Sequence, residues 1–155
     1  MTTELHDKNL SASGPNTSID RAKNNQLLNQ LEQELVDRFP AVECPVIHRF
    51  TPGMYSREIM MPAGSLITSK IHRTEHQFVV LSGLCRVYNA EDDSFLELSA
   101  GHVGITYPGT RRVLYMLEDT RWVTFHPTQL TNLTDIESEL IEPHDIPTKA
   151  ALENT

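Results

Sequence analysis

The sequence has few of the residues and patterns on which several classes of protein depend. Its only two cysteines, Cys44 and Cys85, are too few for a disulfide framework or for a zinc site built from thiolates. No apolar run approaches the roughly 20 residues of a membrane-spanning helix. Residues 1–20 contain no apolar block of the kind found in signal peptides. We therefore expect a soluble, cytoplasmic protein with no membrane partner.

The sequence also lacks an excess of positive charge. Its 21 acidic and 13 basic residues give a net charge of −8 over 155 residues. Because nucleic-acid binding depends on Lys and Arg side chains that displace counterions from phosphates, we expect no nucleic-acid partner. The acidity is concentrated in residues 130–155, where six acids and one base give −5, whereas nine acids and eight bases give residues 41–129 a charge of −1. Binding of an anionic ligand would therefore depend on nearby arginines rather than on the net charge of the chain.

The N-terminal part of the chain is predicted to be an arm followed by one helix. Residues 1–18 are polar and are predicted to form a flexible arm. The segment 19–40 is predicted to be helical, because Leu27, Leu31 and Leu35 recur every four residues before a proline ends the pattern. The apolar stripe is narrow, so this helix must pack either on its own domain or on a partner subunit.

The middle of the chain, residues 41–129, changes to short runs of β-type alternation separated by turn residues. Many short strands at regular spacing indicate an all-β fold, either an antiparallel sandwich or a barrel, and alternation alone does not distinguish the two. The predicted strands are Val46–Thr51, Tyr55–Met61, Ser65–His72, His76–Ser82, Cys85–Asn89, Ser94–Leu98, Val103–Tyr107, Arg112–Leu117 and Arg121–His126.

The C-terminal segment, residues 130–155, is predicted to form a short acidic helix and a tail. The helix is expected at Thr134–Ile141, because Thr134 followed by Glu137 fits a capping box.

Two histidines are spaced as metal ligands. His72 and His76 lie four residues apart across a tight corner, and Phe78 and Val80 continue the same parity. Because alternate residues of a strand share a face, both imidazoles are predicted to border an apolar interior. Iron, zinc, nickel and manganese are the divalent metals that such a site would bind. The alternative is that both histidines only form hydrogen bonds with polar groups at the edge of this interior.

His126 is the candidate for a third metal ligand, and Glu75 is an alternative that would complete a two-histidine, one-carboxylate site. If residues 118–119 form a two-residue turn, the flanking strands pair as a hairpin and Arg111 lies opposite His126. This register would place Arg111 and His126 on one face of the hairpin and Arg112 on the other.

Arg111 and Arg112 are candidate ligands for an anionic group, because a planar guanidinium binds a carboxylate or phosphate through two hydrogen bonds. A surface salt bridge is the alternative role. Tyr115 and Trp122 are candidate ligand-binding residues on the same hairpin, or else packing residues. No serine or cysteine nucleophile can be assigned to a catalytic triad, so catalytic residues stay unknown and the metal would be the main reactive group.

The spacing of these residues resembles the first motif of the cupin superfamily, a glycine followed by His-x-His, a glutamate and a second glycine seven residues later. Gly64 and Gly83 fit the two glycines. His72 takes the place of the second histidine, His76 takes that of the glutamate, and Lys70 stands where the first histidine is expected.

The second cupin motif is also discernible. In a gap-free alignment, Gly101, Gly109 and Arg112 fall on its two glycines and its terminal histidine, while Pro108 is displaced by one position. This alignment points Arg112 toward the interior and conflicts with an inward His126 on the predicted hairpin. A β-bulge or a register slip of one residue would reconcile the two.

The resemblance spans roughly residues 60–118 and implies a cupin-type double-stranded β-helix, or jelly-roll barrel, often dimeric, with a metal or organic ligand inside. The superfamily includes dioxygenases, isomerases, lyases and non-catalytic proteins, so the fold does not name a reaction. We expect a homodimeric cupin barrel that binds a divalent transition metal (Fe, Zn, Ni or Mn), a small anionic molecule, or both. The alternative is a non-catalytic cupin that acts as a structural, assembly or binding module.

The run TRRVLYMLEDTRWVTFHPT is also similar to small cupin-like proteins encoded in tailed-phage genomes. That similarity would imply a viral or prophage source, with the protein in the host cytoplasm or the virion.

Overall fold

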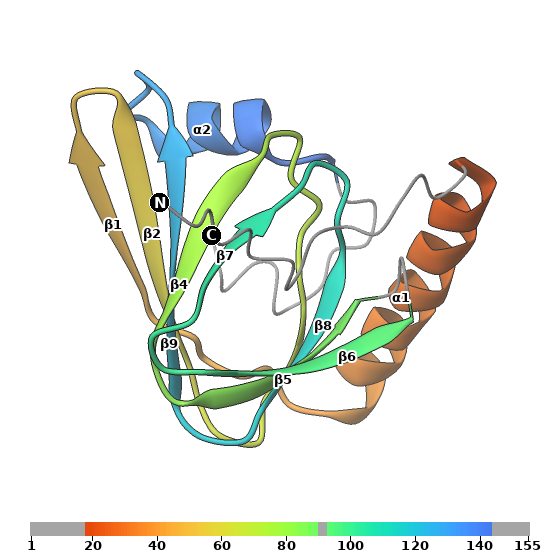
Figure 1. Ribbon diagram of the computed structural model, residues 1–155. Coiled ribbons are helices and arrows are strands. Elements are labelled where there is room, and N and C mark those ends of the chain that lie inside the picture. Colours follow the sequence, from red (N-terminus) through yellow and green to blue (C-terminus); the bar gives the residue numbers. More distant parts are fainter. Residues whose placement is uncertain (1–17, 90–92, 144–155) are drawn as a thin grey trace, which may run out of the picture.

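Two antiparallel sheets that face each other form the body of the protein (Figure 1). The computed structural model describes residues 18–89 and 93–143. Their helices and strands are α1 (Ser18–Arg38), β1 (Val46–Thr51), β2 (Met54–Met61), β3 (Leu66–Thr68), β4 (His76–Ser82), β5 (Leu84–Asn89), β6 (Ser94–Ser99), β7 (Val103–Thr106), β8 (Arg112–Met116), β9 (Thr120–Pro127) and α2 (Leu133–Leu140). The five-stranded sheet has the order β1-β2-β9-β4-β7, and the four-stranded sheet has the order β3-β8-β5-β6.

The predicted all-β fold is confirmed, and each predicted strand corresponds to an observed one. The third strand is the main difference, because β3 ends at Thr68 rather than at His72. Beyond β3, the backbone N–H of Ser69 still donates to the Arg112 carbonyl (2.8 Å), but His72 forms only an isolated bridge with Ile141. The chain therefore leaves the sheet before it reaches the first candidate metal ligand.

The last two strands do not form the hairpin that a two-residue turn at residues 118–119 would produce. β8 pairs with β3 and β5, whereas β9 pairs with β2 and β4, so the two strands belong to different sheets. The connection between them is held by the N–H groups of Leu117 and Glu118, which both donate to the carbonyl of Leu84. Because β8 and β9 face each other across the interior, Arg112 and His126 both point inward, and the conflict between the motif alignment and the hairpin disappears.

The apolar core fills the end of the barrel near the β4–β5 turn. Phe78 and Trp122 stack there with ring centroids 4.4 Å apart and an interplanar angle of 10°. Val80, Cys85 and Met116 have no measurable exposure. Complete burial of side chains of this size contributes about 1.5–3 kcal/mol each to folding.

Gly83 forms the tight β4–β5 turn, and we expect Gly83→Ala to lower the free energy of unfolding by about 2–3 kcal/mol. Its φ is +93°, and a Cβ there would overlap the carbonyl oxygen of Asp119 and the side chain of Thr120. Gly64 is the matched control, since its φ is +81° but a Cβ would meet nothing within 4 Å. Chemical denaturation of Gly64→Ala should show only the backbone cost, about 1 kcal/mol. Equal losses of stability in Gly83→Ala and Gly64→Ala would show that the overlap at Gly83 does not add to the backbone cost.

Glu58 connects three strands on the outer face of the five-stranded sheet. Its carboxylate accepts hydrogen bonds from Arg49 on β1 (2.8 Å) and Arg121 on β9 (2.8 and 2.5 Å), and its side chain is only 4% exposed. These hydrogen bonds hold the pKa of Glu58 below its ordinary value of 4.5.

A lowered carboxyl pKa stabilises the fold above the pKa of the unfolded chain, and this contribution is lost as the pH falls through the folded pKa. We expect Glu58→Gln to be less stable than the natural protein at pH 7 by about 2 kcal/mol, the scale of hydrogen bonds to a charged group. The difference should shrink as the pH falls below 4.5, because the natural carboxyl then becomes protonated. Urea denaturation at pH 7 and pH 4 measures this, and a pH-independent difference would contradict it.

Helix α1 is attached to the end of the four-stranded sheet through polar contacts as well as apolar ones. Arg111 donates to the Asn25 carbonyl (3.1 Å) and to Asn29 Oδ1 (2.7 Å), and it forms an ion pair with Glu32 (2.8 Å). Leu28 is buried on this face, whereas Leu27, part of the predicted stripe, is 57% exposed. The face of α1 that contacts the barrel is therefore rotated from the predicted one. It includes Leu28 and Glu32, and Glu32 pairs with Arg111 of the barrel. The predicted arm lies outside the described residues, apart from the start of α1.

Helix α2 covers the end of the interior that lies away from the β4–β5 turn (Figure 1). Its N-cap is Asn132, whose side chain accepts the N–H groups of Thr134 and Asp135, so the predicted capping box at Thr134 is wrong. Ile136 and Leu140 pack against Tyr55 of β2. Neither helix in the described part of the chain has the length and apolar character needed to cross a membrane. The predicted C-terminal tail lies outside the described residues from residue 144 onward.

Candidate metal centre

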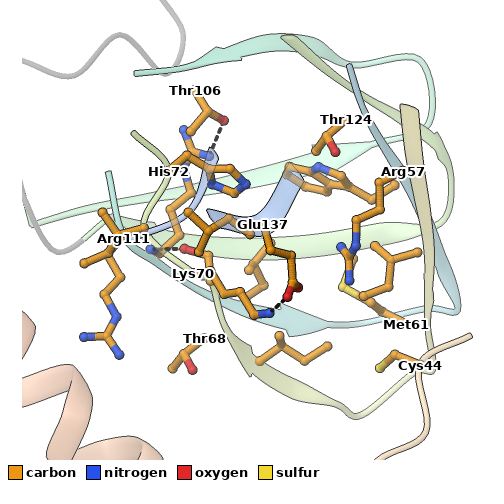
Figure 2. A pocket seen from close by; sticks show the side chains of 18 of the residues that line it. Cys44, Arg57, Met61, Thr68, Lys70, His72, Thr106, Arg111, Thr124 and Glu137 are labelled. Atoms are coloured by element: carbon orange, nitrogen blue, oxygen red, sulfur yellow. Dashed lines mark hydrogen bonds and ion pairs between the residues drawn. The ribbon is translucent and has the colours of Figure 1, made fainter. Parts of the chain in front are cut away.

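Three histidines from separate parts of the chain converge between the sheets. His76 begins β4 and His126 lies near the end of β9. His72, labelled in Figure 2, lies in the connection between β3 and β4. Their ring centroids are 4.3 Å (His72–His76), 4.5 Å (His76–His126) and 5.5 Å (His72–His126) apart. One nitrogen from each ring can be chosen so that all three lie within 4.8 Å of one another.

Strand register and two backbone contacts position these rings. The pairing of Gln77 with Phe125 places His76 beside His126 on the inner face. His72 is held outside the sheet, because its carbonyl accepts the N–H of Gly109 (2.9 Å) and its backbone bridges to Ile141. Two β-strands and the end of α2 therefore determine the triad.

Burial keeps all three imidazoles uncharged at neutral pH. Desolvation is the largest cause of the lowered pKa of His72, to about 2, of His126, to about 3, and of His76, to about 4. Positive charge on Arg57 and Arg112 lowers the pKa of His72 further. Because a metal binds the neutral imidazole, these shifts leave the triad ready for a cation without first losing protons.

Hydrogen bonds select which ring nitrogen faces the centre. His76 Nδ1 lies 3.4 Å from the Thr74 carbonyl, which can only accept, so that contact leaves Nε2 as the available lone pair. His126 Nε2 lies 2.9 Å from Thr124 Oγ1. His126 Nδ1 is buried and has no hydrogen-bond partner among the described residues. A buried nitrogen without a partner is costly, and a metal ion would satisfy it while Nε2–H donates to Thr124.

Two arginines flank the triad from opposite sheets. Arg112, on β8, donates from Nη1 to Thr106 Oγ1 (2.8 Å), and its guanidinium carbon lies 5.5 Å from the centre of the Phe78 ring. Arg57, on β2, is paired in register with Thr124 and lines the same cavity. Sequence reasoning did not select Arg57, although its parity with Ile59 would have placed it inward once the register was known.

The other predicted site residues divide between the cavity and the outside. Trp122 is buried and lines the cavity. Arg111 also lines it, but its guanidinium is 3% exposed and bonded to α1 (Figure 2). Tyr115 is 41% exposed on the outer face of β8 and does not line the cavity, because it has the opposite parity to Arg112. Glu75 is exposed and is not part of the triad.

The cavity beside the triad has a volume of about 770 Å³ and is bounded by both sheets, α1 and α2. This is within the range of sites for small organic molecules. Lys70, at the position of the missing cupin histidine, forms an ion pair with Glu137 of α2 (3.3 Å) at the cavity wall.

No protein-family model and no curated protein matches the sequence. Among solved structures, salicylate 1,2-dioxygenase from Pseudoaminobacter salicylatoxidans aligns with a TM-score of 0.51 and 16% identity, over 79% of this chain and 35% of the enzyme. A protein of unknown function from Vibrio parahaemolyticus aligns at 0.49 and 11% identity, over 56% of this chain and 93% of that one. A cupin-2 domain protein from Shewanella frigidimarina aligns at 0.45 and 13% identity, over 63% and 92%.

The chain has a cupin-type jelly-roll fold, which it shares with salicylate 1,2-dioxygenase. Within this fold, His72 and His76, which resemble the first cupin motif, both reach the triad, and Arg112, at the terminal position of the second motif, points inward. The third imidazole is supplied by His126, which lies beyond both motifs on β9. The triad is therefore assembled differently from the motif pattern that the sequence resembles.

Proposed function

We propose that this cupin binds one divalent transition metal through His72, His76 and His126 and holds a small organic anion beside it. The observation that carries the proposal is the convergence of three neutral imidazoles, one of them with a buried nitrogen that lacks a partner among the described residues. Imidazole ligands suit zinc, iron and nickel, and three protein ligands leave coordination positions open for water or a ligand. When bound, the metal would supply Lewis-acid or oxygen-activating chemistry.

Arg112 and Arg57 are the proposed anion-binding residues. Thr106 orients the Arg112 guanidinium, and the apolar surroundings of the cavity strengthen any charge-assisted hydrogen bond made there. A solved structure with the same fold, salicylate 1,2-dioxygenase, is named for one carboxylic acid and has been solved with another, gentisate. At 16% identity this likeness concerns the fold, so the support for an anion comes from the two arginines.

Elemental analysis of the purified protein tests the metal proposal. We expect about one equivalent of transition metal per chain, and a loss of affinity well beyond 100-fold in His72→Ala, His76→Ala and His126→Ala, since even outer-shell changes cost 10- to 100-fold. His102→Ala is the matched control, because this histidine contacts Phe78 and lies outside the triad. A metal-free natural protein, with stability unchanged by the three substitutions, would favour the non-catalytic cupin instead.

We also propose that the partner of this chain is a second copy of itself. β7 is an edge strand, and Val103 and Ile105 on it are 51% and 37% exposed. Exposed apolar edge strands tend to pair with other chains. Light scattering should give twice the chain mass of 17.5 kDa, and a monomer at micromolar concentration would contradict this proposal.

A further inference from the structure

The inner face of the five-stranded sheet changes from polar to apolar along its strands. At one end Tyr55 pairs with His126, and His76 lies beside His126 because the next residues, Gln77 and Phe125, pair. Four residues along each strand, the paired positions carry Ile59, Trp122 and Val80. At roughly 3.3 Å per residue these two levels lie about 13 Å apart, which is enough for an extended chain of eight carbons.

The four-stranded sheet changes in the same direction. Arg112 is paired with Asn89 at the level nearest the triad, and the next inward level carries Leu114 between Val87 and Ile67. Both sheets therefore present hydrogen-bonding groups at the level of the triad and hydrocarbon four residues along β2, β4 and β9 or two along β8, and Arg57 of β2 lies between the two levels.

The cavity is lined by residues of both levels. Its lining includes the three histidines, Cys44 and Met61, together with Leu35, Val36 and Phe39 of α1. Figure 2 shows His72 at one side of this space and Arg57, Met61 and Cys44 at the other.

Two carboxylates in the cavity wall form ion pairs. Glu137 is paired with Lys70 (3.3 Å) and also interacts electrostatically with Arg57, and Glu32 is paired with Arg111 (2.8 Å). Glu142 also borders the cavity but is exposed to solvent. The positive charge that reaches the histidines comes from Arg57 and Arg112, whose guanidinium groups both act on His72.

We propose that the ligand of this cavity is an amphipathic organic monoanion. Its anionic head lies between Arg57 and Arg112 beside the triad, and its apolar body extends along Trp122, Leu114 and Ile67. This inference rests on the proposed function and specifies the class of ligand. Aliphatic and aromatic carboxylates both have an anionic head on a hydrocarbon body, and the experiment distinguishes between them.

Trp122 is the only tryptophan of the chain and lines the cavity, so its fluorescence reports on ligand binding directly. We would titrate the zinc-loaded protein with butanoate, hexanoate and octanoate, and with benzoate as the aromatic arm. The dissociation constant should fall about fourfold for each methylene added to the aliphatic series, because each methylene is buried against apolar side chains. If benzoate binds more tightly than octanoate, the body is aromatic, and the proposal of an apolar body still holds.

Two further ligands and two variants locate the head and the body. Octanol lacks the head charge, and suberate places a second carboxylate at the apolar end, so both should bind at least tenfold more weakly than octanoate. Ile67→Asn should weaken octanoate at least tenfold and leave butanoate unchanged. Tyr115→Asn is the matched control, because Tyr115 faces outward on the neighbouring strand β8 and should leave both affinities unchanged.

The outcomes separate this inference from the proposed function. Equal affinities along the aliphatic series, or tighter binding of suberate than of octanoate, would overturn the amphipathic ligand while leaving metal and anion binding intact. Metal binding without binding of any carboxylate would overturn it as well. Chain-length dependence that persists in metal-free His126→Ala would support the inference and separate it from the metal site. Absence of both metal and carboxylate binding would remove the proposed function and this inference together.

Discussion

Saturating Zn²⁺ is expected to raise the midpoint of thermal unfolding by about 10 °C, and His126→Ala is expected to abolish this shift. A metal that binds only the folded state at 1,000 times its dissociation constant stabilises that state by about 4 kcal/mol. For a chain of this length, each kcal/mol corresponds to about 2–4 °C. His126→Ala is the most informative of the three variants, because His126 Nδ1 is buried without a hydrogen-bond partner among the described residues.

Differential scanning calorimetry with and without Zn²⁺ measures this effect. His102→Ala should keep the full shift, because His102 is not part of the triad. A shift of equal size in the natural protein and in His72→Ala, His76→Ala and His126→Ala would show that the metal binds elsewhere.

Arg111→Ala is expected to lower the free energy of unfolding by about 3–5 kcal/mol. Its ion pair with Glu32 is 3% and 8% exposed on the two sides, so the substitution leaves a buried carboxylate without its cation. The same substitution also removes the hydrogen bonds that hold Asn25 and Asn29 of α1. The effect should therefore be a loss of attachment of α1 as well as a loss of stability.

Arg86→Ala is the matched control for this prediction. Its ion pair with Glu97 is of similar length, 2.9 Å, but the two side chains are 58% and 54% exposed. Exposed pairs contribute about 0–1 kcal/mol, so urea denaturation should show a small loss. The double variant Glu32→Leu with Arg111→Leu should recover much of the stability, because replacing both partners leaves no buried charge. Equal losses in Arg111→Ala and Arg86→Ala would contradict the importance given to burial.

The strands could be predicted from the sequence, but their pairing could not. Alternation and turn residues depend on a few neighbouring residues, and so β4, with His76–Ser82, was predicted with its observed bounds. Pairing depends on residues far apart in the chain. The short turn at Glu118–Asp119 favoured a hairpin, but the chain there crosses from one sheet to the other.

The candidate site shows the same division between local features, which the sequence predicts, and long-range contacts, which it does not. His72 and His76 followed from local parity and from their resemblance to a cupin motif. His126 was ambiguous because its direction depended on whether the last two strands pair as a hairpin. Arg111 and Arg112 could not be distinguished from sequence, since neighbouring residues point to opposite sides and only the position of α1 shows which of them it binds.

Anomalous X-ray diffraction at the absorption edge of a bound metal tests the central claim most directly. Crystals grown with Zn²⁺ or Co²⁺ should show one strong peak about 2.0–2.1 Å from one nitrogen each of His72, His76 and His126. A peak at other residues, or saturating metal with no peak among these three rings, would contradict the account.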